Sequence, residues 1–200
     1  MKKHARARLL MVRLSAMMTT TVRKFMAYRM EDFYMPTEPW LSGPVPGISP
    51  LLMPAAHALL QAQNDIVQYA SELTAEQLWR ELPGVPSVGF HLRHIDGSSD
   101  RLLSYTKGAA LTEAQFAFLK TERTPGEPLP TAGELIAAVQ ARIAVLLDFM
   151  RALPEERLLE GRTVGRAQLP TNVLGLLFHI AEHMQRHVGS LIVVAKLVRQ

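Results

Sequence analysis

Residues 171–198 read TNVLGLLFHIAEHMQRHVGSLIVVAKLV, and the fold can be argued outward from this stretch. Thr171 and Asn172 are both preferred N-cap residue types, so we expect a helix to begin there and to continue to about Val198. One face of this helix, at helical spacing, carries Leu176, Ile180, His183, His187, Leu191 and Val194. All of these residues except the two histidines are apolar. Such a stripe predicts an amphipathic helix whose apolar face packs against other helices.

Three further long helices are expected upstream, over about residues 51–73, 86–108 and 131–153. Each carries apolar side chains near helical spacing, and strand signals are few. Thr131 with Glu134 forms a capping-box pattern at the start of the third helix. Thr74 with Gln77 forms another, before a short extra helix. Four long amphipathic helices without internal repeats predict an all-α four-helix bundle.

The connections between these helices differ in length and composition. Residues 109–130 contain a second short helix, expected over 112–120, and are long enough to cross the bundle. The helices on either side of this connection therefore need not be antiparallel neighbours. Residues 160–170 (EGRTVGRAQLP) are polar and contain glycine, and we interpret them as a separator between the last two long helices.

The chain before the first long helix has a different composition. Residues 36–50 (PTEPWLSGPVPGISP) are rich in proline and glycine, which cannot propagate a helix or a sheet. We therefore expect a disordered extension over residues 1–49 and a bundle domain over residues 50–200. Three interpretations of the extension stay open: an upstream start or flexible segment, a targeting peptide, or a basic arm that binds a partner. The alternative start residues are Met17, Met26, Met30 and Met35.

The net charge of +4 is concentrated in the first residues of the chain. Residues 1–30 hold eight basic side chains and no carboxylate, so the rest of the chain holds 14 Lys and Arg against 18 Asp and Glu. Because the body is mildly acidic, we expect no nucleic-acid partner for it. No segment has eighteen uninterrupted apolar residues, so we also expect no membrane partner and a cytoplasmic location.

Histidine is the residue type best able to carry chemistry in this chain. There is no cysteine, which excludes disulfides, thiolate ligands and cysteine nucleophiles. An enzyme of this composition would rely on oxygen, nitrogen or metal chemistry, and seven histidines are present.

His179, His183 and His187 follow one another in steps of four residues. Residues four apart lie one turn above each other on the same helix face, so two such imidazoles can converge on one metal ion. His183 and His187 fall on the apolar stripe, whereas His179 aligns with a polar flank made of Gly175, Glu182, Arg186 and Ser190. Buried imidazoles need polar partners. A metal ion would satisfy both; hydrogen bonds within the core or contact with solvent are the alternatives.

A second histidine cluster, FHLRHIDG at residues 90–97, lies on the helix expected over 86–108. His91 and His94 are three residues apart, and periodicity does not choose between them as a third ligand. Three nitrogen donors would leave positions open to water or substrate, which is typical of catalytic metal sites. Asp96 and Asp100 are candidates to orient a ligand, or they are solvated carboxylates.

Two segments of the chain resemble the DinB-like superfamily of metal-binding four-helix bundles, which includes the YfiT-type proteins and bacterial thiol-dependent transferases. They are SVGFHLRHIDGSSDRLLSYTKG at residues 87–108 and LLFHIAEHMQRHVGSL at residues 176–191. The resemblance covers about residues 50–198 and implies that the metal ligands are His94, His183 and His187. It also matches Gly189, but the next residue, commonly glutamine in relatives, is Ser190 here.

The resemblance implies a divalent metal ion, either zinc, nickel, iron or manganese, because imidazoles suit all four. It also implies one of two enzymatic activities: transfer of a low-molecular-weight thiol to an electrophile, or metal-assisted hydrolysis of a small-molecule substrate. The alternative is a non-catalytic metal-binding protein of stress response or partner binding, whose site would be closed by a fourth ligand such as His91. Glu182 is the candidate general base, His57 is a further candidate site residue, and a homodimer is expected.

Overall fold

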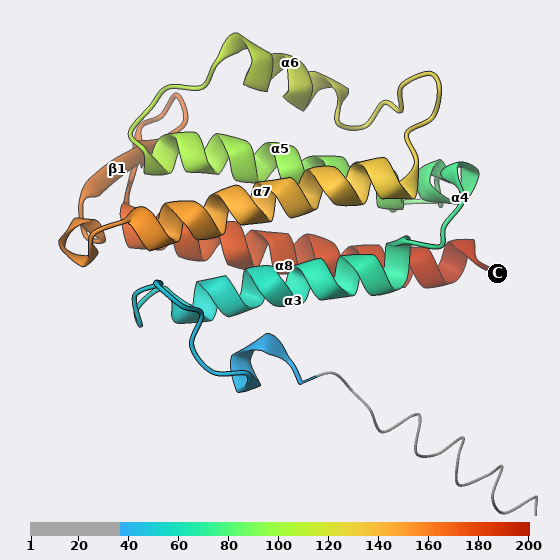
Figure 1. The fold of residues 1–200 in the computed structure, drawn as a ribbon. Coiled ribbons are helices and arrows are strands. Elements are labelled where there is room, and N and C mark those ends of the chain that lie inside the picture. The colour runs from blue at the N-terminus through green and yellow to red at the C-terminus, as the bar shows by residue number, and fades with distance from the viewer. Residues whose placement is uncertain (1–36) are drawn as a thin grey trace, which may run out of the picture. The chain divides into compact units, whose positions relative to one another are not determined.

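Four long helices make up the body of the protein in the computed structural model, which describes residues 37–200 (Figure 1). They are α3 (Met53–Ala70), α5 (Val88–Thr106), α7 (Ala132–Ala152) and α8 (Val173–Val198). The shorter described elements are η1 (Pro39–Leu41), α4 (Ala75–Trp79), α6 (Glu113–Thr121), η2 (Glu155–Arg157), β1 (Gly161–Val164) and β2 (Leu169–Asn172). The predicted all-α bundle, with its short extra helix, is confirmed.

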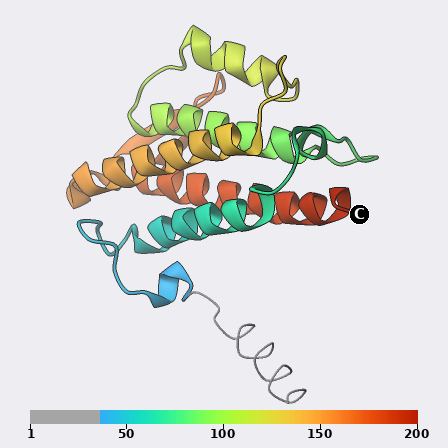
Figure 2. The same cartoon turned by 45° about the vertical axis from the view of Figure 1, so that its right-hand side comes forward.

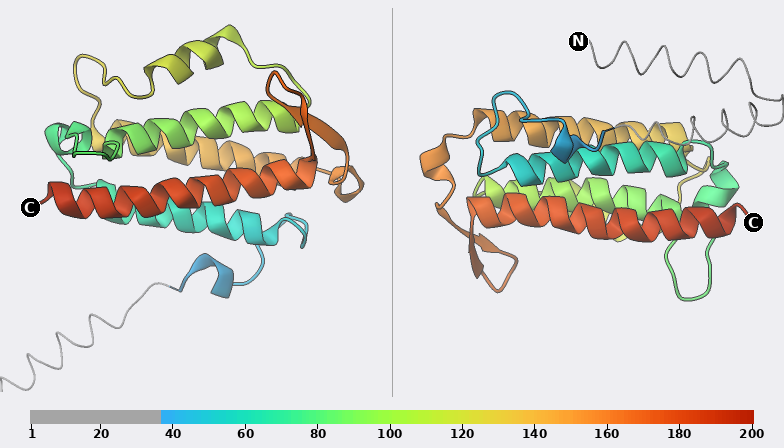
Figure 3. Two further views of the ribbon diagram at one scale, coloured as in Figure 1. Left: turned by 180° about the vertical axis from the view of Figure 1, so that it is seen from behind. Right: turned by 90° about the horizontal axis from the view of Figure 1, so that it is seen from below.

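The four long helices do not simply alternate in direction along the chain. α3 and α8 run in one direction, and α5 and α7 run in the other, as the colours show from the front and from behind (Figures 1 and 3). α5 and α7 can be parallel neighbours because α6 carries the chain back along the outside of α5 before α7 begins (Figure 2). The long connection over residues 109–130 therefore has the consequence expected of it.

Side-chain caps set where the helices begin. The side chains of Thr74 and Thr131 each accept a hydrogen bond from the backbone N–H of the third residue after them. The side chain of that third residue accepts a hydrogen bond from the backbone N–H of the threonine, so both predicted capping boxes are confirmed. Of the two candidate caps of α8, Asn172 is used, because its Oδ1 accepts a 2.7 Å hydrogen bond from the Gly175 N–H. Local sequence therefore fixes the starts of α4, α7 and α8.

The hydrophobic core lies between the four long helices, and each of them contributes fully buried side chains. They include Leu59 of α3, Leu92 of α5, Leu146 of α7, and Leu177 and Ile180 of α8. Each large apolar side chain removed from water contributes about 1.5–3 kcal/mol to stability. This packing holds α5 beside α8, which is the pair of helices that carries most of the histidines. Within residues 37–200, no helix is both long and apolar enough to cross a bilayer.

A two-stranded hairpin precedes α8, and the sequence interpretation missed it. β1 pairs with β2 in an antiparallel register that places Gly161 opposite Asn172. Arg162 Nε donates a 2.8 Å hydrogen bond to the carbonyl of Thr106, which ties the hairpin to the end of α5. Strands of four residues offer too few alternating positions to give a periodic signal. Residues 160–170 are thus a paired hairpin rather than an irregular separator.

The segment before α3 belongs to the same compact unit as the bundle, which spans Pro39–Gln200. Ile48 is buried in the core, and His57 Nε2 donates a 2.9 Å hydrogen bond to the carbonyl of Gly43. The bundle unit therefore begins at its η1 turn rather than at the expected residue 50. The interpretations that concern residues 1–36, namely alternative starts, a targeting peptide or a basic arm, lie outside the described residues.

Candidate metal centre

Three histidines on two adjacent helices converge. His94 lies on α5, and His183 and His187 lie on α8. Each offers one ring nitrogen, and these three atoms lie within 4.8 Å of one another. The ring centroids are 4.4 Å apart for His94 and His187, 4.7 Å for His183 and His187, and 5.2 Å for His94 and His183. These three residues, here called the histidine trio, are the ones predicted as ligands, and no other such group occurs among residues 37–200.

The environment of the trio keeps two of its imidazoles neutral. Burial, reinforced by the neighbouring His94, lowers the pKa of His183 to about 4 and that of His187 to about 3. At neutral pH each ring therefore has a nitrogen lone pair that can bind a metal ion. All three side chains are half-buried, and 20% of the His94 side chain is exposed, so solvent reaches the site. This donor set fits a divalent transition-metal ion.

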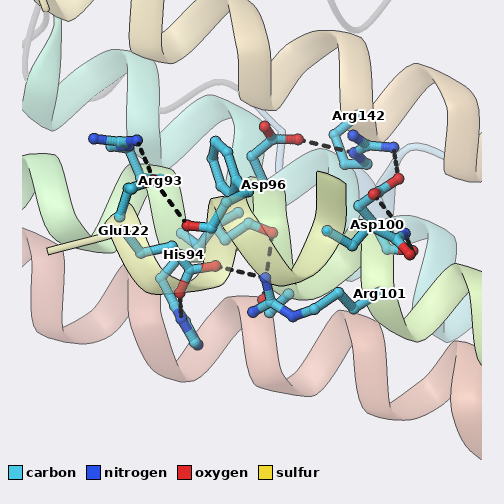
Figure 4. Close-up of polar contacts among 12 residues, drawn as sticks. Arg93, His94, Asp96, Asp100, Arg101, Glu122 and Arg142 are labelled. Carbon is cyan, nitrogen blue, oxygen red and sulfur yellow. Dashed lines mark hydrogen bonds and ion pairs between the residues drawn. The ribbon is translucent and has the colours of Figure 1, made fainter. Parts of the chain in front are cut away.

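Glu122, just after α6, completes the surroundings of His94, and sequence reasoning did not identify it. Its side chain is only 3% exposed, and its Oε2 accepts a 2.8 Å hydrogen bond from His94 Nδ1 (Figure 4). Its Oε1 accepts a 2.7 Å hydrogen bond from Arg101 Nη1. Burial opposes ionisation of Glu122, but these hydrogen bonds outweigh it, so the pKa of this carboxyl lies below its usual value. Because a carboxylate only accepts, His94 carries its proton on Nδ1 and keeps Nε2 for a metal ion.

Asp96 and Asp100, the carboxylates proposed from sequence to orient a ligand, contact α7 instead. Asp96 Oδ1 accepts a 2.8 Å hydrogen bond from Arg142 Nε, and Asp100 pairs with the same guanidinium (Figure 4). Neither is among the partners of His94 in the described chain. The prediction from sequence was wrong because closeness in sequence to His94 does not determine the direction in which a helical side chain points.

His91 is buried beside the trio without belonging to it. It is 4% exposed, and its Nδ1 lies 3.0 Å from His187 Nδ1, so one ring donates a hydrogen bond to the other. Burial lowers the pKa of His91 to about 4, so this ring is neutral at neutral pH. Its Nε2 is buried without a hydrogen-bond partner. Among the described residues the trio therefore has no fourth protein donor, and a bound ion would keep positions open to small molecules.

The remaining histidine candidates are not members of the trio, although the ring centroid of His179 lies 5.5 Å from that of His183. His179 is 44% exposed at the edge of α8, where its Nδ1 lies 2.7 Å from Glu182 Oε1. The polar flank argued from the sequence thus places it correctly. His57 contacts the segment before α3, as described above.

The side chains of Glu182 and Ser190 both make contacts with other residues of α8. Arg186 contacts both oxygens of Glu182, at 3.1 Å and 2.9 Å, in addition to the contact with His179. Ser190 Oγ donates a 3.2 Å hydrogen bond to the Arg186 carbonyl, one turn earlier in the same helix. The departure at position 190 therefore leaves the trio itself intact.

An aromatic ring and a guanidinium border the trio. The ring of Phe90 stacks on that of His94, with centroids 5.4 Å apart and planes at 23°. Arg123 lies over the ring of Phe90, with its guanidinium carbon 4.6 Å from the ring centroid. An exposed cation thus stands next to the half-buried imidazoles.

Comparison with known proteins supplies a family and a fold. The sequence profile of the DinB superfamily matches residues 58–191. No curated protein matches the chain. Among solved structures, the chain is similar to a conserved protein from Enterococcus faecalis, with a TM-score of 0.57 and 17% sequence identity. The match covers 74% of this chain and 96% of that protein, and at this identity it speaks for the fold alone.

Proposed function

The chain belongs to the DinB superfamily, and from that premise we propose that it binds one divalent metal ion through His94, His183 and His187 and acts on a small-molecule substrate there. The observation that carries the proposal is the convergence of three imidazole nitrogens within 4.8 Å without a fourth protein donor among the described residues. A structural site would be closed by a fourth ligand. His91, the candidate for that role, is instead paired with His187.

Transfer of a low-molecular-weight thiol to an electrophile is the reaction that the surroundings favour. A divalent ion held by neutral imidazoles acts as a Lewis acid that lets a bound thiol ionise near neutral pH. The chain has no cysteine, so the sulfur would come from the substrate. The protein's own contribution is to hold the ion, to leave one side open, and to present Arg123 as a cation that favours an anionic substrate.

Hydrolysis is the second enzymatic candidate, and it has less support. It requires a group that takes a proton from the attacking water. Glu182 was the expected base, but His179 and Arg186 occupy its carboxylate, and among the described residues Glu182 is not part of the trio. A thiol is a stronger acid than water, so on a bound ion it would lose its proton to solvent more readily than water would, without help from a protein base.

Elemental analysis of the purified protein, followed by a turnover screen, tests the proposal. We expect about one divalent ion per chain and conversion of electrophiles only when a thiol is supplied, with activity lost on adding a chelator and regained on restoring the ion. Protein without bound metal even after incubation with zinc, nickel, iron or manganese would refute the metal site. Stoichiometric metal whose cobalt(II) spectrum does not respond to any added thiol would favour the non-catalytic alternative.

A further inference from the structure

Glu122 is a buried carboxylate with its two oxygens engaged by two different partners. A buried charge is costly unless it is paired and hydrogen-bonded. Here Arg101, itself buried, neutralises the charge through Oε1, and Oε2 is left to His94. The arrangement aims one carboxylate oxygen at the proton of a single imidazole (Figure 4).

The backbone of α5 makes room for this carboxylate at Gly97. A Cβ added there would lie 2.5 Å from Glu122 Oε1 and 2.6 Å from the ring of Phe118 on α6. Contacts that short do not occur, so any side chain at this position would force the side chains of Glu122 and Phe118 to shift. Glycine inside a helix is less stable than alanine by about 0.5–1 kcal/mol. That local cost is accepted where a close approach needs the space.

Glu122 also fastens the connection that carries it. α6 has no buried residue of its own, and a cleft of about 370 Å³ lies beside it, lined by residues of α5, α6 and α7 that include Asp100, Gln115 and Phe118. The remaining contacts of this connection with α5 are more exposed, such as those of Arg93 with Thr121 and Thr124. Glu122 is therefore the deepest polar link between this segment and the ligand-bearing helix.

We propose that Glu122, held by Arg101, is a positioning residue of the metal centre that fixes the orientation of His94 and links metal binding to the docking of α6. The inference rests on the proposed metal site. A carboxylate on the far nitrogen of a ligating histidine sets its tautomer and ring orientation and makes it a better donor, and its removal commonly weakens metal binding 10–100-fold. By thermodynamic reciprocity, an ion that stabilises the His94–Glu122 pair must also stabilise the docked position of α6.

The test compares Glu122→Gln with the matched variant Asp96→Asn. Both replace an arginine-paired carboxylate by its amide near the same stretch of α5, but only Glu122 contacts His94. With zinc as the ion, competition against a chromophoric chelator should show roughly 10–100-fold weaker binding for Glu122→Gln and less than about twofold change for Asp96→Asn. The cobalt(II) absorption spectrum should shift for the first variant alone, which a merely structural effect would not produce.

A second measurement needs no variant. Hydrogen exchange of the wild-type protein should slow in residues 113–122 on addition of zinc. Equal zinc affinity and equal cobalt spectra in the two variants, or exchange in α6 that does not respond to zinc, would overturn the inference and leave the metal site standing. Absence of zinc binding by the wild-type protein would instead overturn the proposed function and this inference together.

Discussion

At the scale of single residues, the trio consists of two histidines from one helix and one from another, and it is the only such group of donors among residues 37–200. A site of three imidazoles that loses one keeps only two donors. Affinity for a divalent ion then falls steeply, because each ligand is a direct metal–nitrogen bond.

His183→Ala and His94→Ala are each expected to abolish stoichiometric metal, measured by elemental analysis of the purified variants. His179→Ala is the control, since His179 is 44% exposed and bonded to Glu182. It should retain about one ion per chain. Retention of metal by either of the first two variants would remove its residue from the ligand set.

His91→Leu tests whether His91 is a ligand or only a neighbour. We expect about one ion per chain to remain, because His91 contacts His187 and is not a member of the trio. Leucine removes the buried Nε2 that lacks a partner, but it also breaks the hydrogen bond with His187, so the free energy of unfolding in urea should fall by about 1–3 kcal/mol. Loss of the ion would show that His91 is a fourth ligand and would revive the closed, structural site.

At the scale of the elements, caps and tethers decide where helices begin and what they hold. The helices that bear the trio are anchored at their starts by Ser87 for α5 and Asn172 for α8. α7, which bears no member of the trio, begins with its own capping box. A substitution at the start of α7 should therefore change the stability of the protein without changing its affinity for a metal ion.

Thr131→Ala should lower the free energy of unfolding by about 1 kcal/mol, because it removes the side-chain acceptor of the α7 capping box. Urea denaturation measures this change, and Thr131→Ser, which keeps the hydroxyl, should restore most of the loss. Zinc affinity should be the same in both variants. A change in zinc affinity would mean that α7 supports the site more directly than its contacts indicate.

At the scale of the whole molecule, the candidate metal site forms only when the bundle is folded, because the three histidines come from α5 and α8, which are far apart in the sequence. An ion that binds the folded state alone raises the free energy of unfolding by about 2.7 kcal/mol at a free concentration one hundred times its Kd. For a chain of this size, that corresponds to roughly 5–11 °C in Tm.

Thermal unfolding with and without a chelator measures this linkage. We expect the wild-type Tm to fall by several degrees when the ion is removed, and the Tm of His183→Ala to be unaffected by the chelator. An equal chelator effect on both proteins would show that the ion acts elsewhere than at the trio.

The sequence by itself determined what depends on neighbours along the chain. Apolar periodicity predicted the long helices, two capping boxes predicted helix starts, and four-residue spacing placed His183 and His187 on one face with His179 at its edge. Each of these follows from 3.6 residues per turn and from hydrogen bonds within four residues. The choice of His94 over His91 did not follow from periodicity and needed the family resemblance.

Only the tertiary structure decided the contacts between segments that share no period. Glu122 meets His94 across 28 positions and through an intervening connection, and nothing in the spacing of the two residues marks them as partners. The hairpin before α8, the parallel run of α5 and α7, and the pairing of His91 with His187 are of the same kind. They arise because packing in the core fixes how each helix is rotated and shifted relative to its neighbours, and the sequence of one helix does not determine this. The same packing sets the orientation of the candidate ligands.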